Sequence, residues 1–593
     1  MRVSGFVAII AGQPDGTVHE SDLGRLADAY AAVRGGTPGE RVDAGRRARA
    51  CAFGGPGRPS APIERRGSSW ALSAGVPRHG GTLAEARLDD LEGQFALLRH
   101  DATRGTVTLV SDPFGMFGLF VAERAGLTYV STSAMALARH LGAPPSRLGL
   151  HTYLLAGYHC GTMTNWDGVE RVGAGAAVEF GPSGRHGWTY WRPEVDPGTR
   201  RLGIAASVDR CHESAVEAVR SAGAVGTPVW CDLTGGYDTR ILALLARSAG
   251  VSFVTSTNGS GDEEDTRLAR RIAQAAGWEW SLLSLPEPWG RTLPDSLPEA
   301  VGWGDAALDA PQLAGVLWRH RAKAERSRHV LNGGGGEHYW SYAWQHEYGR
   351  SGRSGPTDLD TWVRIRMLRA VPTTVFAGDP RPEVVADLRA RMEPVVAPYA
   401  GEPRAVQADL LYMHKCTGHF GAYAAAAAGH VDVHLPFYTR ASFTAAFSTN
   451  PRHRFGHRFY RRLIDRLDPT IAAIPTAKGG PAQPRRLGNL HAFAPYYVRL
   501  GEKGLNKAAQ RLLGRSFRRP PTLGDDAAAA ARAAAVDHVG TDVGEWHTRA
   551  LYDRAALDGL LGAAGRHDFG DSVLLGRILT AELGLRAAGR GLD

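Results

Sequence analysis

The chain of 593 residues is 43% hydrophobic and 22% charged, which is typical of globular proteins and excludes a disordered or fibrous chain. It is too long for one hydrophobic core, so about two to four domains are expected. Its 69 Lys and Arg against 60 Asp and Glu give a net charge of only +9, which argues against a nucleic-acid partner. The five cysteines have no paired spacing, so we expect neither disulfides nor zinc, and a cytoplasmic location. No apolar run approaches the roughly 20 residues of a membrane span, and Phe6–Ala11 is too short for a signal peptide.

The first 190 residues show short apolar runs separated by turn residues, a pattern that predicts an antiparallel sandwich. A strand is predicted over Val3–Ile10 and a helix over Asp22–Val33, with Ser21 as its cap. The following segment, Arg34–Gly67, is rich in Gly, Pro and Arg and is predicted to be a long surface insertion without regular structure. Further strands are predicted over residues 69–72, 94–98, 107–110, 119–122, 127–130, 178–180 and 188–191.

After a linker predicted at 193–198, strands alternate with helices of about ten residues, a pattern typical of a parallel α/β sheet. Helices are predicted over 204–222, 240–248, 265–276 and 312–326, and strands over 228–231, 252–257 and 329–332. Residues from about 360 onward are predicted to be mainly helical, including a buried alanine tract at Ala424–Ala428. The predicted fold class is therefore α/β: an N-terminal β-sandwich with flanking helices, then a parallel-sheet domain with a largely helical C-terminal part.

The string Thr234-Gly235-Gly236-Tyr237-Asp238-Thr239 lies between a predicted strand and a predicted helix. Glycines let the backbone approach a ligand closely, and free N–H groups at a helix N-terminus favour an anion. A carboxylate repels bare phosphate, but it can hold a Mg²⁺ ion that also contacts phosphate oxygens. The string therefore predicts a site for a magnesium nucleotide. An ordinary β–α turn is the alternative for the Gly-Gly pair alone.

Two later loops also carry chemistry-bearing residues. Asn332–His338 contains four successive glycines after a predicted strand, and its Glu337 is a second carboxylate for Mg²⁺ or water. The irregular segment Ile474–Pro481 presents Lys478, whose charge could close over a phosphate or an acyl-adenylate. A flexible loop and an exposed surface lysine are the respective alternatives.

These motifs, in this order, resemble those of the asparagine synthetase family. Thr234–Thr239 is similar to the family's pyrophosphate loop, Ser-Gly-Gly-x-Asp-Ser, and Asn332–Glu337 to its second loop, Ser-Gly-Glu-Gly-x-Asp. Asp432–Phe437 is similar to the family's Glu-Val-Arg-Val-Pro-Phe. Lys478 matches a loop lysine that acts on the acyl-adenylate in the β-lactam-forming branch.

The resemblance extends to the N-terminal part. Leu91–Leu97, Ser111–Gly115 and Val130–Ser133 are similar to segments of the family's glutaminase-type domain. The resemblance implies a glutaminase-like domain over 1–195 and an ATP-pyrophosphatase (synthetase) domain with a helical extension over 200–593.

Departures from the family pattern narrow the expected activity. The family hydrolyses glutamine with a Cys at position 2, whereas this sequence reads Met1-Arg2-Val3, and Cys51 falls in the predicted insertion. The family's Arg before its Asp-Pro-x-Gly motif is Ser111 here. We therefore expect an N-terminal domain that releases no glutamate from glutamine, as in the similar β-lactam synthetases and lasso-peptide macrolactam synthetases.

Other departures from the family pattern leave the identity of the base that activates the amine undecided. Gly334 stands where asparagine synthetases have Glu, Asp432 replaces a Glu, and the catalytic Tyr of β-lactam synthetases has no match. His338 and His434 are candidate bases because histidine titrates near neutral pH, and buried structural histidines are the alternative.

The resemblance implies an ATP- and Mg²⁺-dependent ligase that adenylates a carboxylate and transfers the acyl group to an amine. The residues implied for ATP or pyrophosphate binding are Leu233, Thr234, Gly235, Gly236, Asp238, Thr239, Thr255, Asn332 and Gly333. Those implied for the metal are Asp238 and Glu337, and those implied for catalysis are Lys478, Asp432 and His338.

The expected substrate is a small molecule or peptide in natural-product biosynthesis, such as the precursor peptide of a lasso macrolactam, with a delivery or protease partner. The stretch Leu574–Leu583 resembles the closing helix of lasso cyclases. The alternatives are an amidotransferase that uses glutamine or ammonia, a tRNA-modifying adenylating enzyme, and a catalytically dead nucleotide-binding scaffold. The mild charge and unpaired cysteines argue against the tRNA enzyme.

Overall fold

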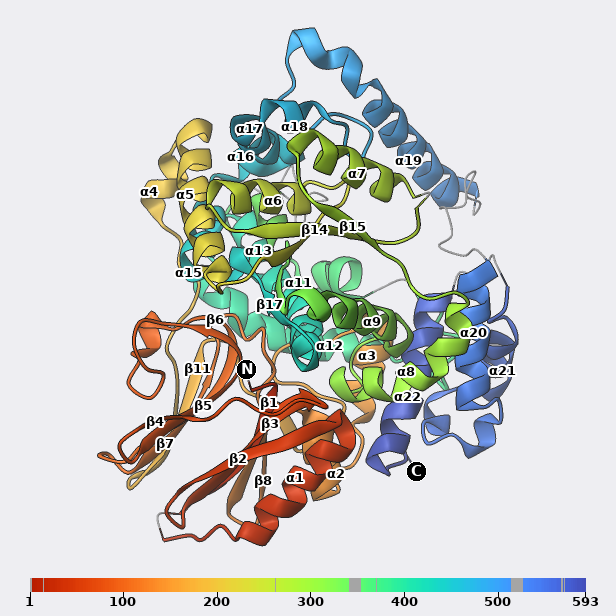
Figure 1. Ribbon diagram of the computed structural model, residues 1–593. Coiled ribbons are helices and arrows are strands. Elements are labelled where there is room, and N and C mark those ends of the chain that lie inside the picture. The colour runs from red at the N-terminus through yellow and green to blue at the C-terminus, as the bar shows by residue number, and fades with distance from the viewer. Residues whose placement is uncertain are drawn as a thin grey trace.

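The computed structural model describes residues 3–592 apart from 14, 262, 341–352, 369–370, 514–525, 567–568 and 570. It contains two antiparallel sheets built from the N-terminal part and one parallel sheet surrounded by helices (Figure 1). This arrangement confirms the predicted α/β fold class.

The N-terminal part forms two six-stranded antiparallel sheets. The first, in spatial order, is β10 (Val169–Arg171), β8 (Phe120–Arg124), β9 (Leu127–Ser131), β1 (Gly5–Ala11), β3 (Ala48–Pro56) and β2 (Gly36–Ala44). The second is β12 (Gly184–Thr189), β11 (Ala176–Gly181), β7 (Thr106–Ser111), β6 (Glu92–Asp101), β5 (Ser69–Arg78) and β4 (Glu64–Arg66). Three helices accompany them: α1 (Glu20–Arg34), α2 (Ala134–Leu141) and α3 (Arg147–Ala156).

The prediction of an irregular insertion over Arg34–Gly67 is wrong. This segment supplies β2 and β3, and Cys51 is buried in β3 opposite Val7 of β1. The Gly and Pro residues of this segment argued against a strand. However, β2 is an edge strand whose register shifts on both sides of Pro38, and edge strands tolerate proline at such irregular positions. The cap was also misplaced, since α1 begins one residue before Ser21.

The parallel sheet has five strands in the order β15 (Trp280–Leu283), β14 (Phe253–Asn258), β13 (Val229–Asp232), β16 (His329–Leu331) and β17 (Asp432–His434). Its crossovers run through α6 (Asp238–Ser248), α7 (Glu264–Ala276), α8 (Trp289–Trp303) and α9 (Ala310–Arg326). The sheet follows α4 (Pro197–Arg201), which occupies the end of the predicted linker, and α5 (Ile204–Gly223). Because all five strands are parallel, their carboxyl ends share one edge, where ligands bind in such sheets.

The chain after β16 is mainly helical, as predicted. Its helices are α11 (Leu359–Trp362), α12 (Arg381–Val396), α13 (Arg404–Cys416), α14 (Ala422–Ala426), α15 (Arg440–Ser448), α16 (Pro451–Arg454), α17 (Arg458–Leu467), α18 (Pro469–Ala473), α19 (Ala494–Leu513), α20 (Asp526–Val539), α21 (Arg554–Gly562) and α22 (Ser572–Ala588). Of the predicted buried alanine tract, Ala426–Ala428 are buried at the end of α14 and in the turn after it, whereas Ala424 and Ala425 are partly exposed. In Figure 1 the last helix, α22, returns to lie beside α8 and α9.

Two polar anchors join the N-terminal part to the rest. The Gln94 side chain of β6 accepts the N–H of Leu435 at 3.0 Å and donates to the carbonyl oxygens of Leu435 and Tyr438, at 3.5 and 3.4 Å. The buried guanidinium of Arg577 in α22 donates to the carbonyl of Leu154, at 2.8 Å, at the end of α3. These contacts hold the parallel sheet and the N-terminal sheets in one interface.

Candidate nucleotide site

The first glycine-rich loop connects β13 to α6 and is held closed by its two threonines. The N–H of Thr234 donates to Oγ1 of Thr239 at 3.0 Å, and the two hydroxyl oxygens are also 3.0 Å apart. Oγ1 of Thr234 accepts the N–H of Gly236 at 3.1 Å, and the N–H of Leu233 donates to the carbonyl of Ser256 at 2.8 Å. The side-chain hydroxyls therefore give the loop a defined shape before any ligand binds.

One N–H group of this loop already holds an anionic oxygen. The N–H of Gly235 donates to Oδ1 of Asp265 at 3.0 Å. A Cβ atom at Gly235 would lie 2.8 Å from that oxygen and 2.7 Å from Cδ1 of Leu268, so a larger residue here would displace the ends of both side chains. The loop is thus built to accept a negatively charged oxygen from its outer side. A phosphate oxygen at the same N–H would replace the exposed carboxylate of Asp265.

The second glycine-rich loop leaves the sheet between β16 and β17. The N–H of Asn332 donates to the carbonyl of His434 at 2.9 Å, and its Oδ1 accepts the N–H of Gly334 at 2.8 Å. Gly335 has φ +94°, and a Cβ atom there would lie 2.7 Å from the ring of Tyr438. The turn therefore needs glycine for both its conformation and its packing.

The two loops meet at Asp238. A Cβ atom at Gly333 would lie 3.5 Å from the backbone carbon of Asp238, which is ordinary contact. A Cβ atom at Gly336 would lie 2.5 Å from Oδ1 of Asp238 and 2.6 Å from the hydroxyl of Tyr460. The absence of a side chain at Gly336 is therefore what lets the second loop reach the first.

Two carboxyl groups, those of Asp238 and Glu337, face one another across this junction. Burial raises the pKa of Glu337 to about 8, and the charge of Asp238 adds to that rise. Burial also raises the pKa of Asp238, against the opposing effects of the Tyr460 hydrogen bond and the Lys478 charge. Oε2 of Glu337 accepts the N–H of Gly335 at 3.1 Å. Crowded, partly desolvated carboxylates of this kind are stabilised by a divalent cation.

The donor set fits Mg²⁺ bound together with a nucleotide. Within the described part of the chain, no group of three or more His, Cys, Asp or Glu side chains is arranged to hold a metal by itself. Mg²⁺ is commonly held by one or two carboxylates, with phosphate oxygens and water completing its shell. Asp238 and Glu337 supply that number of protein ligands.

Lys478 lies over an aromatic stack beside these carboxyl groups. Its Nζ is 3.0 Å from Nε2 of His457 and 4.2 Å from the ring centroid of Trp340. The His457 ring stacks on Trp340 and on Tyr237, with centroids 4.3 and 4.8 Å apart. Burial and the Lys478 charge lower the pKa of His457 to about 2, so this ring is neutral and does not repel the lysine at neutral pH.

The loop that carries Lys478 is attached to the first glycine-rich loop and its helix. The N–H of Ala477 donates to the carbonyl of Gly235 at 3.0 Å. The buried guanidinium of Arg240 donates to the carbonyl oxygens of Ile471, Ile474 and Pro475 at 3.2, 2.8 and 3.0 Å. The position of Lys478 therefore depends on α6 as well as on its own loop.

Three predicted site residues, Thr255, Asp432 and His434, lie apart from this junction. The Thr255 hydroxyl is buried inside the sheet and donates to the carbonyl of Glu279 at 2.6 Å. Asp432 lies at the beginning of β17, with Oδ2 3.6 Å from Nδ1 of His329, whereas the glycine-rich loops follow the ends of strands. Nδ1 of His329 is also 3.3 Å from Nε2 of His434. For all of these side chains the geometry favours structural roles.

His338 is enclosed among aromatic rings. Its Nε2 is 3.3 Å from the hydroxyl of Tyr438, and its ring centroid is 4.8 Å from that of Phe443. Burial and the nearby Arg454 charge lower the pKa of His338 to about 3, so it does not titrate near neutral pH. This geometry argues against the predicted role as a base.

Sequence reasoning missed the side chains that complete the junction: Tyr460, His457 and Trp340. Trp340 follows the second loop directly, and that proximity was a usable signal. His457 and Tyr460 come from the α17 region and reach the site only through tertiary packing. His457 has φ +63°, an uncommon conformation for a residue other than glycine.

The N-terminal part offers no exposed thiol. All five cysteines are buried, and burial raises the pKa of the Cys51 thiol. Met1 and Arg2, on which the expected loss of glutaminase chemistry rests, lie outside the described residues. No helix in the described ranges is both long and apolar enough to cross a membrane.

No protein-family model and no curated protein sequence matches the chain. Among solved structures, it is similar to a glutamine phosphoribosylpyrophosphate amidotransferase from B. subtilis complexed with ADP and GMP, at 10% identity and a TM-score of 0.21. That match covers 42% of this chain and 65% of the other, so the chain spans just under two thirds of its length. A second structure, described as the allosteric regulatory enzyme of purine biosynthesis, matches at 10% identity and a TM-score of 0.23, over 49% of this chain and 76% of the other. At such low TM-scores these likenesses carry no argument about activity.

Proposed function

We propose that this chain is an ATP-dependent carboxylate–amine ligase that releases AMP and pyrophosphate. The observation that carries the proposal is the meeting of Asp238 and Glu337 at neighbouring strand ends, with Lys478 held beside them. Two carboxylates, a glycine-rich helix N-terminus and a nearby cation together suit a magnesium nucleotide.

In this proposal a substrate carboxylate oxygen attacks the α-phosphorus of ATP, and the bond to the pyrophosphate group breaks. A substrate amine then attacks the acyl carbon, AMP leaves, and the amine proton passes to a base or to water. A bound Mg²⁺ ion would neutralise charge on the phosphates. Asp238 and Glu337 would hold that ion, and the N–H of Gly235, once Asp265 releases it, would donate to a phosphate oxygen. Lys478 would offset negative charge that develops on the acyl group.

We further propose that the amine comes from the substrate and not from glutamine. The support is the burial of every cysteine, because a buried thiol with a raised pKa is a poor nucleophile. A natural-product substrate, such as a precursor peptide closed to a macrolactam in the cytoplasm with a delivery partner, remains the substrate class that we propose. The α22 helix, which contains Leu574–Leu583, is mostly buried between other helices, so its described contacts support a structural role.

The decisive experiment is ATP–pyrophosphate exchange with the purified chain and a panel of carboxylates and precursor peptides. We expect Mg²⁺-dependent exchange with at least one member, and Asp238→Asn is expected to reduce it by about 10²-fold or more. Asp295→Asn, which changes an exposed aspartate on α8, is the matched control and should exchange like the wild type.

The outcomes separate the alternatives. Exchange that persists in Asp238→Asn would contradict the nucleotide site. ATP binding without exchange on any acid would instead favour a nucleotide-binding scaffold. Glutamate release from glutamine above a no-enzyme control would favour the amidotransferase alternative.

A further inference from the structure

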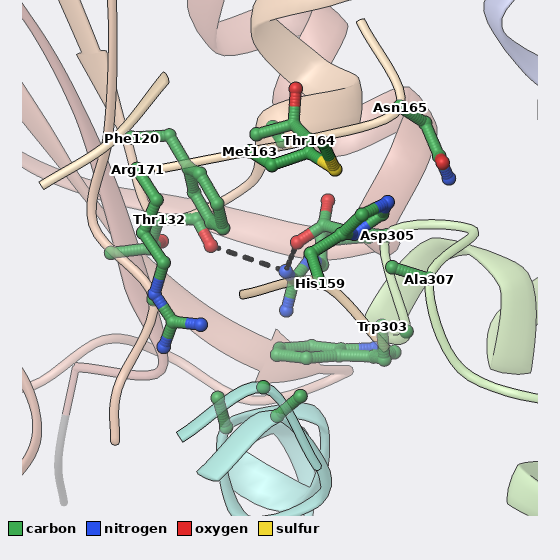
Figure 2. A pocket seen from close by; sticks show the side chains of 17 residues that line it. Phe120, Thr132, His159, Met163, Thr164, Asn165, Arg171, Trp303, Asp305 and Ala307 are labelled. Carbon is green, nitrogen blue, oxygen red and sulfur yellow. Dashed lines mark hydrogen bonds and ion pairs between the residues drawn. The ribbon is translucent and has the colours of Figure 1, made fainter. Parts of the chain in front are cut away.

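A second cavity lies between the N-terminal sheets and the helices that surround the parallel sheet, and the nucleotide-site residues described above do not line it (Figure 2). Its volume is about 60 Å³, enough for a few water molecules or one small organic ion. Both parts of the chain contribute to its walls. Its distinctive side chains are Arg34, Phe120, His159, Asn165, Arg171 and Trp303.

Two of the charges around the cavity neutralise each other. The Arg34 guanidinium donates to Oδ2 of Asp305 at 2.6 Å and lies over the Trp303 ring, 4.8 Å from its centroid. Oδ1 of Asp305 accepts the hydroxyl of Ser133 at 2.5 Å and the N–H of Met135 at 3.2 Å. Figure 2 shows Asp305 above the Trp303 indole in this view. The pair is complete and needs no further counter-ion.

Arg171 is different, because no carboxylate in the described part of the chain forms an ion pair with it. Its guanidinium donates to the carbonyl of Gly115, and its Nε is buried without a partner. The carboxylate that acts on it most strongly, that of Asp112, accepts the N–H groups of Phe114 and Phe117 at 3.0 and 2.8 Å. A guanidinium enclosed by protein without a paired anion is costly.

Arg171 is one of the residues that line the cavity. Neighbouring atoms enclose the side chain, and burial lowers its pKa, yet it lines the cavity and keeps some accessible surface. The other titratable group, His159, has its pKa lowered to about 4 by burial and is neutral at pH 7. The groups that line the cavity therefore carry a net charge of one positive unit, located on Arg171.

A side-chain acceptor lies on the same cavity. The Asn165 side chain is buried, and its Nδ2 donates to the carbonyl of Ala306 at 2.8 Å. That bond fixes the orientation of the amide. Its Oδ1 makes no hydrogen bond of normal geometry to the described residues, although the amide acts on the nearby His159 ring. Phe120 and Trp303 supply apolar walls.

We propose that this cavity binds a small monocarboxylate, with Arg171 as its counter-ion and the apolar walls around its short carbon chain. The single net positive charge of the lining groups suits a monoanion better than a dianion, and the volume limits the ligand to a few heavy atoms. An amino group on the ligand would donate to Oδ1 of Asn165, so glycine is expected to bind more tightly than acetate. The bound ligand would touch both halves of the chain.

Isothermal titration calorimetry of the full chain tests this, with sodium acetate, glycine and the uncharged acetamide as probes. We expect saturable binding of acetate, tighter binding of glycine, and at least tenfold weaker binding of acetamide. Arg171→Met should weaken acetate binding at least tenfold. Arg87→Met, which changes an exposed arginine, is the matched control and should leave it unchanged.

A second variant tests the cavity without touching the charge. Ala422, on α14, also lines the cavity, and we expect the larger side chain of Ala422→Leu to fill most of the space. We expect this variant to melt at or above the wild-type temperature and to lose acetate binding. Equal binding of acetate and acetamide, no binding of either, or unchanged acetate binding in Arg171→Met would show that the cavity holds water only and would overturn the proposal.

Discussion

The hydroxyl of Tyr460 lies 2.5 Å from Oδ1 of Asp238 and also contacts the carbonyl oxygen of Gly336. One phenol thus joins the first glycine-rich loop to the second. The hydrogen bond lowers the pKa of Asp238 against the rise that burial causes. The phenol therefore helps to keep Asp238 ionised and ready for a cation.

Tyr460→Phe should raise the pKa of Asp238, because the ionised carboxylate loses a donor while its burial is unchanged. A hydrogen bond to a charged group contributes about 1.5–3 kcal/mol, so the pH dependence of Mg²⁺ binding should shift upward by about one unit or more. The measurement is Mg²⁺ affinity between pH 5 and pH 9. If Tyr460 had only a structural role, Tyr460→Phe would lower the stability of the protein and leave the pH dependence of Mg²⁺ binding unchanged.

Glu337→Gln should stabilise the Mg²⁺-free protein at alkaline pH. Between its ordinary value of 4.5 and its folded pKa of about 8, the unfolded chain has ionised this carboxyl while the folded chain keeps the proton. The free energy of unfolding therefore falls as the pH rises through that range. We expect a Tm about 2–5 °C above the wild type at pH 9 and little difference at pH 4.

Thermal melts with and without MgCl₂ check this prediction. Mg²⁺ should raise the Tm of the wild type at pH 9, because it binds the folded carboxylates, and should have a smaller effect on Glu337→Gln. A variant less stable than the wild type at pH 9 without Mg²⁺ would show that the two carboxyl groups do not oppose each other.

Lys478→Ala should lower amide formation by about 10²–10³-fold while ATP still binds, because the lysine charge is needed when negative charge develops in the reaction. Lys478→Arg, which keeps the charge beside Trp340 and His457, should retain more activity. Product formation and ATP affinity are measured on the same preparations. Near-wild-type turnover in Lys478→Ala would exclude the role.

His338→Gln should leave adenylation within a few fold of the wild type and lower stability by about 1–3 kcal/mol. The ring packs against Phe443 and its pKa of about 3 keeps it neutral, so its loss removes packing and not a proton acceptor. Denaturant unfolding and exchange assays separate the two effects. A loss of about 10²-fold in rate, with unchanged stability, would restore the predicted role as a base.

The first glycine-rich loop could be predicted from sequence because its chemistry is local: strand, glycines, carboxylate and helix are contiguous. The approach of Glu337 to Asp238 could also be predicted from the sequence, because both loops follow strands of a parallel sheet and such strands end at one edge. The partners Tyr460 and His457 could not be predicted, because packing of α17 onto the sheet brings them there. Thr255 was implied only by the family resemblance, and in the structure it lies inside β14, where its hydroxyl donates to the carbonyl of Glu279.

Two further strands, β3 of the N-terminal sheets and the short β17, could not be predicted from the sequence pattern either. β3 is buried on both faces, so it lacks the alternation that marks a strand, and β17 has only three residues. Such elements are stabilised by their neighbours in the sheet more than by their own side-chain pattern.

Through the Gln94 side chain, the N-terminal part contacts the parallel sheet just beyond its edge strand β17. β17 is the edge of the parallel sheet, and an uncovered edge strand pairs readily with other chains. The amide of Gln94 occupies the N–H and carbonyl of Leu435, directly after that strand, much as a further strand would. The N-terminal part therefore covers the end of this edge, and another chain could not pair with Leu435 while Gln94 is in place.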